Sequence, residues 1–81
     1  MNDGKVFSDM KDKISSAEEG LAVATVHAQM LKNMESILSL GIGSLELCRM
    51  LDVSPMYASE FLKMKKLYKF LIDAGLDPKK L

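Results

Sequence analysis

Apolar side chains recur at spacings of three and four residues along most of the chain, which is the period of an amphipathic α-helix. Sustained alternation of apolar and polar residues, which is typical of a half-buried strand, is absent from the sequence. Proline occurs only at positions 55 and 78, so almost everything between residues 5 and 76 is compatible with helices and the turns that join them. We therefore predict an all-α fold, a small helical bundle of four to five helices.

The N-terminal half predicts two helices that separate near Ser15. The apolar residues of the first are Phe7, Met10 and Ile14. Ser15 and Ser16 are each followed three residues later by a glutamate, a capping-box pattern that indicates the start of a helix over residues 17–40. Glycines at 41 and 43 are expected to end it. The alternative is one continuous helix over residues 5–40 with a heptad pattern, which Gly20 weakens by about 1 kcal/mol relative to alanine.

The helix predicted over residues 17–40 carries two apolar lines. One line consists of Leu21, Ala24, Ala28, Leu31 and Leu38. The other consists of Val23, Val26, Met30, Met34 and Ile37. Two apolar lines on one helix favour two packing partners. We expect the first line to form the interface of a homodimer and the second to pack on the C-terminal half. The alternative is that both lines serve one core within the chain.

Residues 44–63 read SLELCRMLDVSPMYASEFLK and predict two short helices joined by a tight turn. Ser44 is a candidate N-cap of the first helix, whose inner face is expected to hold Leu47, Cys48 and Leu51. Asp52 tolerates the positive φ that such a turn requires, although less well than glycine. Ser54 and Pro55 are expected to start the second helix at Pro55, with Ala58, Phe61 and Leu62 facing back onto the first helix.

This segment resembles the helix-turn-helix of lactose-repressor-type regulators and resolvase-type recombinases. The matching residues are Leu47, Cys48, Leu51, Val53, Ser54, Pro55 and Ala58. Asp52 departs from the usual turn glycine, and Met50 stands where a polar residue is common. The resemblance implies a small sequence-specific regulator that binds double-stranded DNA through the second helix. The DNA-contacting positions that it implies are Ser44, Ser54, Met56, Tyr57, Ser59, Glu60, Lys63 and Lys66.

The charge balance changes this interpretation only slightly. Eleven basic and eleven acidic residues cancel, which is unusual for a nucleic-acid binder. Residues 1–43 hold four lysines and six acids, whereas residues 44–81 hold seven basic residues and five acids. The basic excess therefore lies in the half that carries the motif. The lysines at 63, 65, 66 and 69 fit phosphate contacts, and the alternative is a solvated face that keeps the helix soluble.

The lysines also bear on the shape of the last helix. If a single helix continued past Lys63, Lys65 and Lys69 would project close to the direction of Ala58, which is on the predicted core face. We therefore expect a bend near Met64 and Lys65. The last helix would turn Leu67, Phe70, Leu71 and Ala74 inward and end at Gly75.

The remaining composition narrows the functional class. Eighty-one residues fit one domain, with residues 5–43 as the dimerising part and residues 44–81 as the motif and last helix. Cys48 and His27 are the only residues of their types, so we expect no disulfide, metal, cofactor or catalytic activity. The start MNDGKVFSD is not a signal peptide, and no apolar stretch spans a membrane, so a cytoplasmic protein is expected. The alternative function is a protein-interaction module with a methionine-rich surface and no DNA binding.

Overall fold

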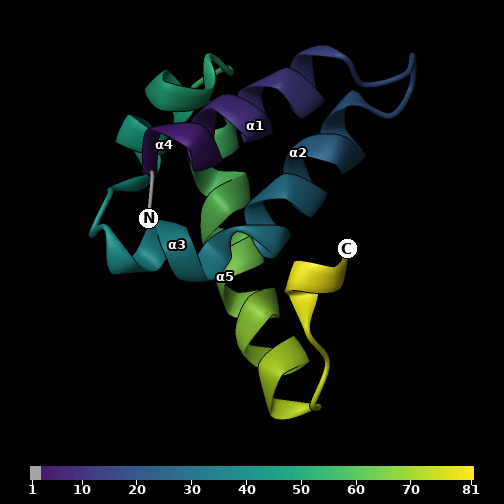
Figure 1. The fold of residues 1–81 in the computed structure, drawn as a ribbon, viewed down its shortest axis with the longest axis vertical. Helices are drawn as coiled ribbons and strands as arrows, with labels where there is room; N and C mark the ends of the chain where they lie inside the picture. The colour runs from purple at the N-terminus through teal and green to yellow at the C-terminus, as the bar shows by residue number, and fades with distance from the viewer. Residues whose placement is uncertain (1–2) are drawn as a thin grey trace.

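Helices make up almost all of the regular structure in the computed structural model, which describes residues 3–81 (Figure 1). They are α1 (Asp3–Ser15), α2 (Ala22–Lys32), α3 (Met34–Ser39), α4 (Ser44–Leu51), α5 (Tyr57–Asp73) and the 3₁₀ helix η1 (Pro78–Lys80). The all-α prediction is confirmed, with five α-helices among the described residues. Residues 1 and 2, which begin the segment that we expect not to be a signal peptide, lie outside this range.

The predicted break near Ser15 is confirmed, but the capping box beyond it is wrong. The Ser15 and Ser16 hydroxyls both donate to the carbonyl of Asp12, so they close α1 instead of starting a new helix. Helix α2 begins only at Ala22, and its N-cap Leu21 makes no side-chain capping bond. Gly20 has φ +86°, a left-handed conformation that suits glycine and sets the turn between the two helices.

The single helix predicted over residues 17–40 is also wrong, because it is divided at Asn33. Asn33 has φ −105° and ψ 12°, outside the regular helical values. Its side-chain amide donates to the carbonyl of Gln29 at 2.9 Å, a local bond that competes with the helical backbone pattern. Helix α3 follows at once and ends before Gly41, whose φ of +68° confirms the predicted stop.

The hydrophobic core lies where α1, α2, α4 and the first half of α5 meet, with α3 closing one side (Figure 1). Its buried apolar members are Phe7, Met10, Val26, Met30, Leu31, Met34, Ile37, Leu47, Cys48, Leu51 and Phe61. The line that begins at Val23 supplies four of these residues, although Val23 itself is exposed. Of the other line, Leu31 is buried and Ala28 half-buried, whereas Leu21, Ala24 and Leu38 are exposed.

Helix α5 runs unbroken from Tyr57 to Asp73, so the predicted bend near Met64 and Lys65 is wrong. Only its first half packs against α4, and its second half extends past the other α-helices (Figure 1). Lys65 and Lys69 therefore remain exposed without a bend. Of the residues expected inward, Leu71 is half-buried, whereas Leu67, Phe70 and Ala74 are exposed.

The chain folds back after α5. Gly75 has φ +79°, and the Leu76 amide donates to the Leu71 carbonyl at 2.9 Å, which confirms the predicted end of the helix. The 3₁₀ helix η1 then contacts α2, and Pro78 is buried there. Lys79 donates to the Glu35 carboxylate of α3 at 2.6 Å. This hydrogen bond raises the pKa of Lys79.

Candidate nucleic-acid interface

A left-handed residue joins α4 to α5. Asp52 has φ 56° and ψ 44° and is the only non-glycine residue with positive φ among residues 3–81. The Asp52 amide donates to the Arg49 carbonyl, and the Val53 amide donates to the Cys48 carbonyl at 3.0 Å. These bonds satisfy two of the last four carbonyls of α4, and the chain reverses within a few residues. The expectation of a turn that depends on Asp52 is confirmed.

The starts of both helices differ from the predicted caps. Gly43, with extended backbone angles, is the N-cap of α4, so Ser44 is the first helical residue and not the cap. Before α5, the Ser54 hydroxyl accepts a hydrogen bond from the Met56 amide at 3.3 Å. A single turn at residues 54–57 intervenes, so α5 begins at Tyr57 instead of Pro55. The Ser54 hydroxyl therefore accepts a capping hydrogen bond as predicted, but three residues before the helix begins.

The inner face of the two-helix unit matches the predicted pattern except at one position. Leu47, Cys48, Leu51 and Phe61 are buried, and Ala58 is half-buried. Leu62, which was expected to face α4, is 50% exposed and lies outside this contact. Burial raises the pKa of the Cys48 thiol, which keeps it protonated and fits a packing role for this residue.

The outer face of α5 carries polar and basic groups that are open to solvent. Ser59, Lys63 and Lys66 are spaced four and three residues apart, so they share one side of the helix, and all three are exposed. The Ser59 hydroxyl donates to the Met56 carbonyl at 3.0 Å. Within residues 3–81, no ion pair engages Lys65, Lys66 or Lys69, whereas Lys63 contacts Glu60 at 2.9 Å. On the side that carries Ser59, Lys66 is therefore the lysine without an ion-pair partner among the described residues.

Glu60 is held between two helices. One carboxylate oxygen lies 3.0 Å from the His27 Nε2 of α2, and the other accepts a hydrogen bond from Lys63. The hydrogen bond from Lys63 lowers the pKa of Glu60, and the bond from His27 acts in the same direction against partial burial. His27 and Glu60 are 33 residues apart, so no local spacing in the sequence indicates this pair. Its effect is to tie the start of α5 to α2.

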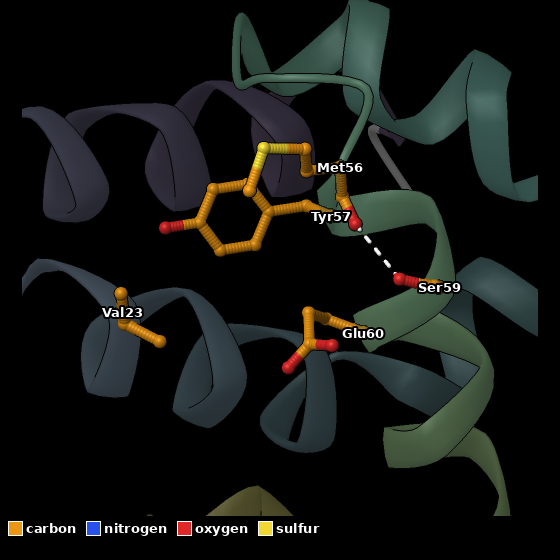
Figure 2. A pocket seen from close by; sticks show the side chains of 5 residues that line it. All are labelled: Val23, Met56, Tyr57, Ser59 and Glu60. Carbon is orange, nitrogen blue, oxygen red and sulfur yellow. Dashed lines mark hydrogen bonds between the residues drawn. The ribbon is translucent and has the colours of Figure 1, made fainter.

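A mostly apolar pocket of about 370 Å³ opens beside this pair (Figure 2). It is lined by Val23, Met56, Tyr57, Ser59 and Glu60. In Figure 2 the Tyr57 ring reaches across the space above α2, with Met56 beside it and the Glu60 carboxylate below. Met56 is 78% exposed. Sequence reasoning placed Met56 and Tyr57 at a binding surface but did not foresee Val23 as part of it.

The eight predicted DNA-contacting residues are spread over the start of α4, the turn before α5 and the first ten residues of α5. Ser54, Met56, Ser59, Lys63 and Lys66 are exposed, whereas Ser44, Tyr57 and Glu60 are half-buried. Within the described residues, no three His, Cys, Asp or Glu side chains gather closely enough to hold a metal ion. No helix in the same range is long and apolar enough to cross a membrane.

The comparisons with known proteins agree with this two-helix unit. No curated protein and no solved structure matches the chain. The sequence model of a family described as an HTH-like (helix-turn-helix-like) domain matches residues 2–74, which includes all five α-helices. The match confirms the resemblance at the level of an HTH-like domain, a kind of domain typical of binding proteins without catalytic activity, and makes no finer assignment to the lactose-repressor or resolvase type. The chain therefore belongs to the HTH-like domain family.

Proposed function

We propose that this protein binds double-stranded DNA as a small sequence-specific transcriptional regulator, with the start of α5 in the major groove. The observation that carries the proposal is the α4–Asp52–α5 unit in an HTH-like domain, whose outer helix face presents Ser59, Lys63 and Lys66 to solvent. In a helix-turn-helix, the first turns of the second helix contact base edges, and flanking groups contact phosphates.

The residues of this face divide by the chemistry of their side chains. Ser59 can bond to a base edge or a phosphate, and Met56 can contact a thymine methyl group. Lys63 and Lys66 lie one and two turns further along α5, where ammonium groups would neutralise phosphates. Glu60 can accept a hydrogen bond from a cytosine amino group only through an oxygen that already has a partner, His27 or Lys63. Its main contribution would be to hold α5 in the orientation in which Ser59 faces the groove.

Ser44, Ser54 and Tyr57 have supporting roles in this proposal. Ser44 stands at the start of α4, where its hydroxyl and the free backbone amides of the first turn can meet a phosphate. Ser54 stands in the turn before α5 and can do the same. Tyr57 packs its ring over the pocket and supports the backbone from which Met56 projects. These contacts position the helix and carry no sequence preference.

The test is a titration of labelled duplex fragments with protein at two salt concentrations, followed by fluorescence anisotropy. Lys63→Ala and Lys66→Ala should weaken binding to all duplexes alike, and each should lower the slope of log affinity against log salt by about one. Lys13→Ala is the matched control, because this exposed lysine lies in the last turn of α1, a helix outside the proposed interface. No binding by the native protein at low salt, or equal slopes for all three variants, would contradict the proposal.

One observation favours a protein partner as the second candidate function. The pocket beside α5 has a mostly apolar lining, and its rim residue Met56 is the most exposed of the large apolar residues. The methionine-rich surface expected for this function is otherwise reduced, because Met30 and Met34 are fully buried in the core. In the same titration, DNA binding that is absent in the native protein would favour this second function over the first.

A further inference from the structure

The second half of α5 carries an apolar stripe that is left exposed by the rest of residues 3–81. Leu67, Phe70 and Ala74 are three and four residues apart, which places them on one side of the helix. Phe70 is 73% exposed and Leu67 is 40% exposed, although both are large apolar residues. We call these three residues the outer stripe. On α5, the proposed DNA contacts end at Lys66, which directly precedes the stripe.

The position of the stripe leaves it accessible to another molecule. The second half of α5 extends past the other α-helices, and the C-terminal segment with η1 folds back beside it (Figure 1). The side of α5 that faces this segment and the core carries Met64, Tyr68 and Leu71, which are half-buried. At 100° per residue, Phe70 is about 100–160° away from these three residues around the helix axis. A helix can therefore approach the stripe without displacing the C-terminal segment.

The charges beside the stripe indicate what approaches it. Lys66 and Asp73 flank the stripe on the same edge, seven residues apart, and both are exposed. Lys66 lies four residues before Phe70, and Asp73 lies three residues after it. If a second α5 packs antiparallel with the two Phe70 residues near the symmetry axis, each Lys66 meets the Asp73 of the other chain. A parallel two-fold pair would instead place these two edges on opposite sides of the interface, where Lys66 and Asp73 of the two chains do not meet.

From this complementarity we infer that the outer stripe binds a second copy of this chain, forming a two-fold antiparallel α5 pair. The expected N-terminal interface fits a second copy less well. Its central residue Leu31 is only 9% exposed, and its exposed members Leu21 and Leu38 stand at opposite ends of the α2–α3 segment. The α5 pair buries identical surfaces on both chains, as a two-fold dimer requires.

The size of the stripe sets the strength of the association. The paired region from Lys66 to Ala74 spans a little over two turns, roughly 12 Å at 1.5 Å per residue. Such a contact is smaller than the interfaces of about 1,200 Å² or more that hold stable dimers. Association is therefore expected at micromolar to millimolar protein concentrations. Each lysine ammonium has three N–H donors, so pairing with Asp73 leaves Lys66 able to contact a phosphate as well.

Sedimentation equilibrium without DNA tests the inference, so its outcome does not depend on the proposed function. The native protein should form dimers as its concentration rises from about 10 μM to about 1 mM, a range set by the small interface. Phe70→Gln should weaken dimerisation by tenfold or more, roughly the loss expected for one buried aromatic contact. Ile72→Gln is the matched control, because Ile72 is exposed on the same helix but on the side away from the stripe. Circular dichroism should show folded protein in both variants.

A charge exchange tests the antiparallel geometry. Lys66→Asp and Asp73→Lys should each weaken self-association by about tenfold, because each places like charges together at two symmetric positions. An equimolar mixture of the two variants should form heterodimers at close to native strength, since each contact then joins opposite charges. A native protein that stays monomeric at 1 mM, an equal effect of Ile72→Gln, or a mixture that fails to associate would overturn the inference. Dimers that survive Phe70→Gln but are lost on changing Leu21 would overturn it in favour of the N-terminal line.

Discussion

Replacing Asp52 by glycine should stabilise the fold. The residue holds φ 56° at the end of α4, where a Cβ atom crowds the following carbonyl. Its side chain is exposed, and within residues 3–81 it makes no hydrogen bond or ion pair. The substitution therefore removes backbone strain and little else, so the change in the free energy of unfolding depends on backbone terms alone.

Two terms of opposite sign determine the size of the effect. The left-handed conformation costs an ordinary residue about 1–2 kcal/mol, and aspartate pays the lower part of that range. Glycine gains this energy but loses about 0.5–1 kcal/mol through the greater entropy of its unfolded chain. The net gain for Asp52→Gly is expected to be about 0.5 kcal/mol. Asp52→Ala, which keeps a Cβ without the local hydrogen bonding available to aspartate, should lose about 0.5–1 kcal/mol.

Thermal and urea unfolding followed by circular dichroism measure both changes. A gain of about 0.5 kcal/mol should raise the midpoint of a domain of this size by about 2–4 °C. Asp52→Asn is the control for charge, since asparagine tolerates the left-handed region as well as aspartate does. If Asp52→Gly lowers the midpoint, or if Asp52→Ala raises it, then residue 52 does not adopt the left-handed conformation and the account of the turn is wrong.

Three further predictions concern the core, the interhelical carboxylate and the thiol. Leu47→Ala should destabilise the fold by about 2–5 kcal/mol in urea unfolding, because this side chain is fully buried, whereas Leu45→Ala at an exposed position should change stability by less than about 0.5 kcal/mol. Since the folded state lowers the pKa of Glu60, its contribution to stability is complete above the ordinary glutamate value of about 4.3 and is lost as pH falls through the folded value. Glu60→Gln should therefore reduce the fall of the unfolding midpoint with pH below about pH 4.5. An unchanged pH dependence in this range would contradict the prediction. The Cys48 thiol is buried and has a raised pKa, so it should react with an aromatic disulfide reagent only at the rate at which the protein opens. Rapid labelling of the folded protein at pH 8 would show instead that the thiol is accessible.

The fold class and the two-helix unit could be predicted from the sequence because their signals are local. Helical periodicity is visible within a dozen residues, and the left-handed turn depends on a single residue, Asp52, that tolerates it. The helix ends were less accurate. Ser15 and Ser16 have the side chains of a capping box, yet their hydroxyls bond backward to Asp12, and sequence alone does not tell the two uses apart. Asn33 divides a helix for the same local reason.

The candidate site could be predicted only in part, because several of its contacts join distant segments. Val23 and Tyr57 line one pocket from different helices, and His27 and Glu60 meet across α2 and α5. The bend expected at Lys65 followed from assuming that all of α5 packs on the core. How far a helix extends beyond its partners depends on the packing of the whole chain, which periodicity does not contain.

The folded-back C-terminal segment has a practical consequence for where this domain can be cut. The family match ends at residue 74, but Pro78 is buried against α2 and Lys79 reaches Glu35 of α3. A fragment trimmed at the family boundary would expose the surface that Pro78 covers and release one end of α5 from α2. Such a fragment is expected to melt earlier than the 81-residue chain. The boundary of the family match and the boundary of the folded unit therefore differ here by at least five residues, 75–79.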